Sequence, residues 1–207
     1  MAITTYAELQ AAIANYLNRD DLASIIPTFI ANAEAQINRD VNHWRQETRT
    51  DISVSSQYYD LPADWRSAVR LSVSTAEGPV EIEQVSLSDI TDMRTVSADT
   101  ANTPRFYAIA GGSLEFYPTP SSTVTVTLIY RATIPALSNS NTSNWLLQQA
   151  PDVYLHGSLI DAHTYLYDDQ RLQPTILFYT RAVQSLNADS KRAKFGGTGL
   201  RVRVNSY

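Results

Sequence analysis

The spacing of apolar residues changes twice along the chain, and this change constrains the fold more than any other feature. Near both ends, apolar residues recur every three or four positions, which is the spacing of one face of an α-helix. Through the middle they alternate with polar residues, as expected for half-buried strands. The predicted order is therefore two helices, a block of antiparallel strands, two further helices and an extended tail.

Each helical pair is too short to bury its apolar face alone, and joining the two pairs is the simplest solution. The predicted fold class is α+β: a four-helix bundle formed by N- and C-terminal helical pairs, with an inserted antiparallel β domain and an extended C-terminal arm. The predicted boundaries are residues 1–43 and 144–194 for the bundle, 44–143 for the β domain and 195–207 for the arm.

Local motifs agree with this division. Thr5 and Glu8 have the spacing of a capping box at a helix start. Pro151 suits the first turn of a helix, where its missing N–H costs little. Two alternating runs flank Gly111 and Gly112, which predicts a β-hairpin, and residues 124–130 form the clearest strand pattern in the chain.

Charge is spread unevenly along the chain. The formal net charge is −5, yet residues 191–207 contain five Lys or Arg and no Asp or Glu, so the rest of the chain carries −10. An acidic body with a basic end favours an acidic partner for that end. The alternative, left open by composition, is a solvated tail whose charges keep it soluble.

The last residues of the chain have the alternation of a strand. Residues 200–204 read Leu-Arg-Val-Arg-Val, a segment too short to be stable alone, so we expect it to join the sheet of another protein by strand addition. The preceding glycines would serve as a hinge. The predicted docking residues are Lys191, Arg192, Lys194, Phe195, Leu200, Arg201, Val202, Arg203 and Val204.

Motifs of enzyme active sites are missing from the sequence. Cys is absent, and there is no G-x-S-x-G, kinase or P-loop motif. His156 and His163 are about 10 Å apart along a helix, too far for one metal ion. Asp60 and Asp64 lie in turn-forming contexts, which explain them without catalysis. We therefore predict no enzymatic activity, no cofactor and no metal.

Two other classes of protein are also disfavoured. No apolar run is long enough for a transmembrane helix, and the N-terminus lacks the pattern of a secretory signal, so cytosolic synthesis is expected. The chain has 12 Tyr, but the β block that holds several of them is not basic, as a nucleic-acid groove would be. Core packing or protein contact explains these tyrosines better.

Several segments, in order, resemble the head–tail connector proteins of bacteriophages. The segments are YAELQAAIANYLNRDDLASIIPTFIANAEAQINRD, the Asp60–Trp65 turn, the hairpin GGSLEFYPTPSS, VTLIYRATIPAL, and NWLLQQAPDVYLHGSLIDAHTYLYDDQR. Each is of modest specificity alone, but together they cover nearly the whole chain. The inserted β domain is similar to that of short-tailed-phage adaptors known as tail tubular proteins.

This resemblance implies a structural role in the virion. In such adaptors, copies form a ring, commonly of twelve, beneath the portal ring of the filled capsid. The ring prolongs the DNA channel and offers a surface to the tail, and the C-terminal arm reaches into the portal. The implied partners are the portal protein, tail nozzle or tube proteins, neighbouring copies, and genomic DNA that passes without sequence-specific binding; no membrane is involved. The implied location is the portal–tail junction, after synthesis in the host cytoplasm.

Two alternatives remain open at the level of sequence. One is another tail-completion or gatekeeper ring protein of the same general character. The other is a carbohydrate-binding or hydrolytic tail component built on the β block, for which Asp60 and Asp64 would be the residues to test.

Overall fold

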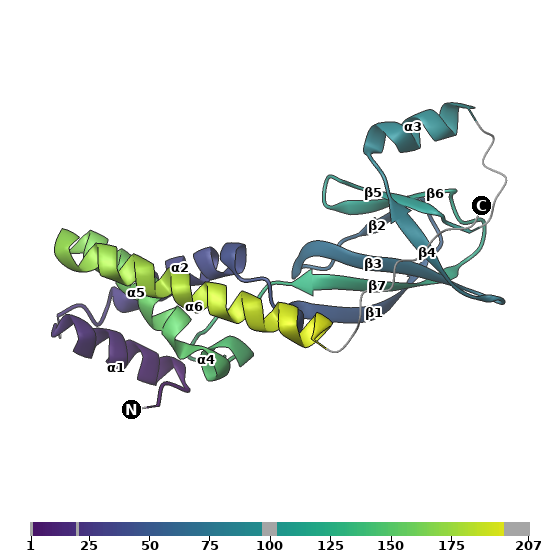
Figure 1. Ribbon diagram of the computed structural model, residues 1–207. Helices are drawn as coiled ribbons and strands as arrows, with labels where there is room; N and C mark the ends of the chain where they lie inside the picture. The colour runs from purple at the N-terminus through teal and green to yellow at the C-terminus, as the bar shows by residue number, and fades with distance from the viewer. Residues whose placement is uncertain (1, 20, 97–102, 197–207) are drawn as a thin grey trace. The chain divides into compact units, whose positions relative to one another are not determined.

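The computed structural model describes residues 2–19, 21–96 and 103–196, which divide into two compact units (Figure 1). The helical unit consists of the described residues of Met1–Arg45 and Ile134–Tyr207. The β unit consists of those of Gln46–Thr133. The polar connector after the last strand therefore lies with the helices, because Leu137 is buried in their core.

Five helices build the helical unit in the described residues. They are α1 (Tyr6–Leu17), α2 (Ile26–Asp40), α4 (Trp145–Gln149), α5 (Pro151–Tyr165) and α6 (Asp169–Phe195). The predicted capping box is confirmed, since the Glu8 N–H donates to Thr5 Oγ1 and Glu8 Oε2 accepts from the Thr5 N–H. Pro151 lies in the first turn of α5, as predicted, and Pro27 lies in the first turn of α2.

Helix α5 is the centre of the helical unit. It contacts α1, α2, α4 and α6, and Val153, Tyr154, Ser158 and Ala162 are fully buried. A helix that is buried on most of its sides, with polar Ser158 and His163 among its buried residues, has the central position in a core. The other helices surround α5, each with one apolar face turned toward it.

The β unit contains seven strands and one helix in its described residues. The strands are β1 (Glu47–Val54), β2 (Tyr58–Asp60), β3 (Trp65–Thr75), β4 (Gly78–Gln84), β5 (Phe106–Ala110), β6 (Ser113–Tyr117) and β7 (Val124–Ala132), and the helix is α3 (Leu87–Val96). The strand order is β1-β7-β3-β4-β5-β6-β2. The predicted hairpin is confirmed: β5 and β6 pair antiparallel across Gly111 and Gly112, both with positive φ.

One pair of strands in this sheet is parallel. Glu83 and Gln84 of β4 lie opposite Phe106 and Tyr107 of β5, and α3 lies in the connection between the two strands. Parallel neighbours need a crossover connection, most often a helix, so α3 is what makes this pairing possible. Ile90 of α3 is fully buried with Ala108 and Tyr117 of the sheet.

The predicted fold class is wrong. The protein is a mixed α/β protein with a seven-stranded sheet, not a four-helix bundle carrying an antiparallel β insertion. The sheet is mixed because of the β4–α3–β5 crossover, and the helical unit has a central helix rather than two docked pairs. The predicted arm lies almost entirely outside the described residues.

Candidate functional site

The last turn of α6 holds the described part of the predicted docking segment. Up to Ser190 the helix is tied to its own unit: Asn187 Nδ2 donates to the Asp40 carbonyl at 3.0 Å, and the Trp44 N–H donates to Ser190 Oγ at 2.9 Å. Every residue from 191 to 196 is exposed. Helix α6 is therefore packed against its own unit up to Ser190, and its basic last turn is exposed to solvent.

The side chains of this end combine charge with apolar surface. Lys191, Arg192 and Lys194 are exposed, and Phe195 is 63% exposed. Arg192 pairs with Asp189 one turn earlier, at 3.2 Å and in solvent, so the pair contributes little to stability. Cations in the last turn also interact favourably with the helix dipole. Leu200, Arg201, Val202, Arg203 and Val204, the other predicted docking residues, lie outside the described residues.

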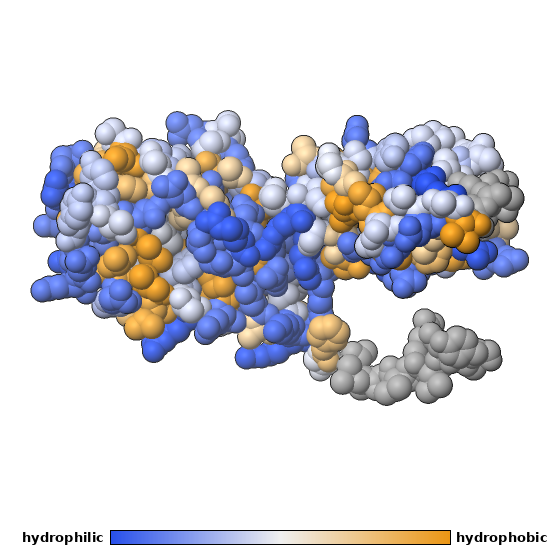
Figure 2. Space-filling model, turned by 90° about the horizontal axis from the view of Figure 1, so that it is seen from above, coloured by the Kyte–Doolittle hydropathy of each residue, from blue (hydrophilic) through white to orange (hydrophobic). Residues whose placement is uncertain are grey.

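Two grooves flank α6 on different sides. The α2 groove lies between α2, α5 and α6, has a volume of about 530 Å³, and includes Gly157, Ile160 and Ile176 in its lining. The α1 groove lies between α1, α5 and α6, has a volume of about 440 Å³, and includes Tyr16, His156 and Phe178. Figure 2 shows hydrophobic surface exposed between hydrophilic side chains on this unit.

The lining of the α2 groove includes small side chains, the carboxylates of Asp40 and Asp161, and the guanidinium of Arg39. Ala33 and Gly157 bring α2 and α5 close, since a Cβ on Gly157 would lie 3.3 Å from the Ala33 Cβ. The Tyr179 hydroxyl donates to Asp40 Oδ2 at 2.9 Å, and burial, aided by Asp40, raises the Tyr179 pKa far above its usual value. Asp161 Oδ2 is shielded from solvent and accepts no hydrogen bond within the described residues.

The α1 groove is aromatic. Phe178 is 51% exposed and stacks at a tilt against His156, with ring centroids 5.3 Å apart, and Tyr16 is 60% exposed. Burial lowers the pKa values of His156 and His163, which keeps both rings neutral at pH 7. Nothing in this geometry resembles a metal site, and the described residues contain no group of three possible metal ligands.

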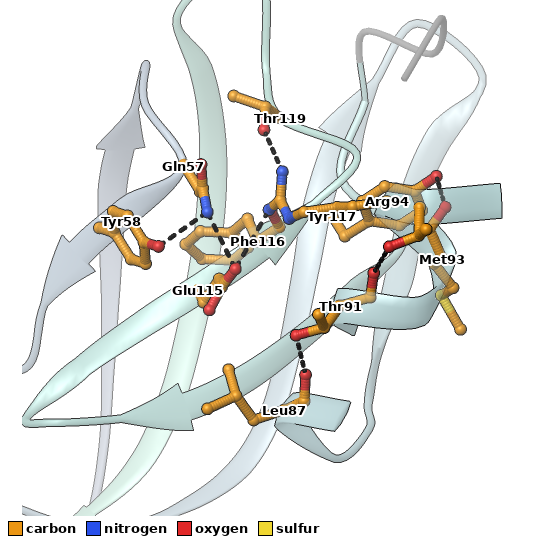
Figure 3. Close-up of polar contacts among 11 residues, drawn as sticks. Gln57, Tyr58, Leu87, Thr91, Met93, Arg94, Glu115, Phe116, Tyr117 and Thr119 are labelled. Carbon is orange, nitrogen blue, oxygen red and sulfur yellow. Dashed lines mark hydrogen bonds and ion pairs between the residues drawn. The ribbon is translucent and has the colours of Figure 1, made fainter. Parts of the chain in front are cut away.

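In the β unit, a polar cluster fixes α3 to the sheet (Figure 3). Arg94 of α3 donates to the Phe116 carbonyl at 2.8 Å and to Thr119 Oγ1 at 3.1 Å, and its guanidinium lies 3.4 Å from buried Glu115. The Glu115 carboxylate also accepts from Gln57 Nε2 at 2.9 Å. These contacts hold a helix whose exposed face is mostly polar and includes two exposed apolar residues, Leu87 and Val96.

The carboxylates considered for catalysis have structural partners. Asp60 Oδ1 accepts from Ser113 Oγ, and Asp64 Oδ1 accepts from the Tyr130 hydroxyl, each at 2.9 Å. Burial and the hydrogen bond to Asp64 raise the pKa of Tyr130 to about 12. Asp60 and Asp64 therefore each have a structural role as hydrogen-bond acceptors, in agreement with the structural explanation given from the sequence.

The residues that line the two grooves were not predicted from the sequence. Leu177 and Phe178 lie off the apolar stripe of α6 that Ile176, Tyr179 and Val183 define, yet they are as apolar as the stripe itself. Apolar residues outside the buried stripe indicate a second apolar face on the helix, and Phe178 on that face could have identified the α1 groove.

Two surface grooves, a basic helix end and exposed large apolar side chains such as Phe178 and Phe195 are together typical of a protein that works by association with other proteins. The model of one protein family, described as SU10 adaptor protein, matches residues 4–203. The chain therefore belongs to the SU10 adaptor protein family. No match was found among curated proteins.

Family membership confirms the predicted resemblance to phage head–tail adaptors and makes the protein a structural component of the phage particle. It favours a non-enzymatic role. The predicted tail tubular subtype stays a prediction. In the described residues, no helix has the length and apolar character needed to span a membrane.

Proposed function

We propose that the protein is a head-to-tail adaptor that forms a ring beneath the portal. The ring extends the DNA channel and provides the surface to which tail nozzle or tube proteins attach. The observation that carries this proposal is the family match over residues 4–203, which includes both units and the basic end of α6. The ring of about twelve copies implied by the resemblance is a closed cyclic assembly, the common form of such oligomers.

Portal contact is assigned to the C-terminal segment. The described end of α6 offers Lys191, Arg192 and Lys194 as cations with Phe195 as an apolar contact. The segment 200–204 continues with alternating Arg and Val, which suits addition to a sheet edge of the portal protein. The adaptor would then lie at the portal–tail junction of the virion, after synthesis in the host cytoplasm.

The charge of the remaining chain supports passage of DNA. Outside residues 191–207 the chain carries −10, and affinity for DNA depends on cations that neutralise phosphates. A channel wall of this composition would let DNA slide without sequence-specific contact.

Deletion of residues 195–207 tests the portal assignment. We expect the truncated protein to stay folded, because the buried residues of α6, of which Ser190 is the last, are all retained, and to lose binding to the portal in a pull-down assay. The triple variant Lys191→Glu, Arg192→Glu and Lys194→Glu should lose binding too. Arg49→Glu, an exposed charge change on β1, is the control and should bind normally.

Two outcomes would contradict the proposal. Normal portal binding by the truncated protein would show that residues 195–207 are not needed for docking, and would favour the alternative of a solvated tail. Cryo-electron microscopy of tailed particles that shows no density for this chain at the portal–tail junction would exclude the adaptor position. Capture of tail proteins without the portal would favour the alternative of a tail-completion or gatekeeper ring.

A further inference from the structure

The two grooves beside α6 have complementary shapes and charges. The α2 groove is hollow and its lining includes the carboxylates of Asp40 and Asp161 with the guanidinium of Arg39, whereas the α1 groove is aromatic, and both belong to the helical unit. We propose that they are the two halves of the contact between neighbouring copies: the α1-groove side of one copy packs against the α2 groove of the next. This inference rests on the proposed ring and names the surfaces that close it.

The helical geometry of α6 places these surfaces on different sides of one helix. Ile176 and Thr180 line the α2 groove, whereas Pro174 and Phe178 line the α1 groove. Residues four apart share a side of a helix, and the two pairs are offset by about half a turn, since each residue advances about 100°. A copy can therefore use both grooves at once, with a different neighbour at each.

Shape is the first argument for this pairing. Tyr16 and Phe178 line the α1 groove and are each more than half exposed, and Leu177, next to Phe178 on α6, is also more than half exposed. The α2 groove offers a hollow of about 530 Å³ whose walls include Ala33, Ala35 and Gly157. Small side chains around a hollow leave room for an aromatic ring, and buried aromatic anchors are what dominate the affinity of protein interfaces.

Charge is the second argument. Arg181 follows Phe178 by one turn on the same side of α6, is exposed, and has no ion pair within the part of the chain that the structure describes. Asp161 in the α2 groove has a carboxylate oxygen that is shielded from water and accepts no hydrogen bond within those same residues. The Asp161 residue lines the groove, so an incoming guanidinium would pair with its carboxylate, against repulsion from Arg39 in the same lining.

The symmetry of the contact follows from the use of two different surfaces. A contact between unlike surfaces is heterologous, and it generates a closed ring when the rotation between copies closes. A twofold dimer would instead need one self-complementary surface. The pairing of Phe178 and Arg181 with the α2 groove thus predicts a ring rather than a dimer.

Cysteine cross-linking tests the contact, because the chain has no cysteine of its own. The variant Ala35→Cys with Leu177→Cys carries one thiol on each side of the contact and keeps the Phe178 anchor, and both positions are exposed. In assembled particles under oxidising conditions, we expect a ladder of covalent oligomers that ends at the closed ring. Each single-cysteine variant should give no ladder. A double variant that behaves like the single ones would overturn the inference.

Charge reversal is an independent test with its own rescue. Arg181→Asp should lower incorporation into rings by about tenfold, as expected for loss of a close interfacial charge pair. Arg181→Asp combined with Asp161→Lys should restore it, with folding of each variant checked by thermal unfolding. Arg49→Asp on β1 has the same change of charge and should assemble normally.

Failure of this inference can be told from failure of the proposed function. Wild-type rings at the portal–tail junction, with no effect of Arg181→Asp and no ladder, would retain the adaptor role and reject the contact. Cross-linked ladders from a protein that never occupies the junction would retain the contact and reject the adaptor role.

Discussion

At the scale of single residues, buried polar side chains hold the connector to the helices. Glu34 of α2 is buried, and its Oε1 accepts from the Leu137 N–H at 2.7 Å. Burial raises the pKa of Glu34, and the hydrogen bond from Leu137 offsets part of that rise. The folded protein therefore binds a proton at Glu34 more tightly than the unfolded chain does.

The contribution of Glu34 to the free energy of unfolding therefore depends on pH, and its sign follows from the raised pKa. Because the folded-state pKa is raised, Glu34 stabilises the fold least at high pH, and stability is lost as pH rises from about 4.5 through the folded-state pKa. Glu34→Gln keeps a carbonyl to accept from Leu137 but does not titrate. We expect the stability of this variant relative to wild type to increase across that window and then stay constant.

Urea unfolding of both proteins from pH 4 to 8 measures this difference, since other titrating groups contribute equally to both. The prediction would fail if the difference were flat with pH or decreased as pH rises.

A second buried residue, Asn144, joins three segments at once. Its Nδ2 donates to the Pro135 carbonyl at 2.8 Å and to the Tyr154 hydroxyl at 2.7 Å, and its Oδ1 caps α4 by accepting from the Leu147 N–H. Asn144→Ala leaves these partners unsatisfied in a buried site, so we expect a loss of roughly 2–4 kcal/mol in urea unfolding. Asn141→Ala, in the more exposed part of the connector, should cost well under half of that, and equal losses would refute the argument.

At the scale of elements, α3 depends on Arg94. Arg94→Met removes the bonds to Phe116 and Thr119 and leaves Glu115 without its cation. We expect a loss of about 2–4 kcal/mol and faster amide exchange in α3, because a buried carboxylate loses its paired charge. Arg70→Met breaks the exposed pair with Glu81 and should cost less than about 1 kcal/mol. Similar losses for the two variants would show that Glu115 does not need Arg94.

Elements were predictable from the sequence where local pattern decides them. The capping box of α1, the Pro-initiated α2 and α5, and the β5–β6 hairpin all follow from short-range chemistry, and the structure confirms them. The β4–β5 pairing was not predictable, since it depends on Ile90 and Arg94 docking α3 across residues that look like a short turn and a loop. Likewise, α5 carries apolar residues on more than one face, and only packing shows that it is the central helix.

The candidate site was predictable only where a local sequence pattern forms it. The basic end of α6 is a local cluster of charge and was identified from the sequence. The grooves are formed by α1, α2, α5 and α6 together, and residues such as Tyr16 and Asp161 share no local pattern.

At the scale of the whole molecule, the two units have separate cores. The β unit buries Leu71, Phe116, Val126 and Leu128 among its own strands, and the helical unit buries a different set around α5. The chain enters and leaves the β unit at neighbouring points, because Glu47 of β1 lies opposite Arg131 of β7. A unit with its own core and adjacent ends has what an independently folding domain requires.

We therefore predict that Gln46–Thr133, produced alone, folds into the same sheet. The expected result is a cooperative urea transition and a dispersed amide spectrum, with exchange protection strongest in β3 and β7, the interior strands with the longest pairing. A fragment that begins after β1 is the control: it would expose the β7 edge together with Val126 and Leu128, and should aggregate or stay unfolded. An unfolded Gln46–Thr133 fragment would mean that the helical unit is needed to form the sheet, so that the two units fold as one.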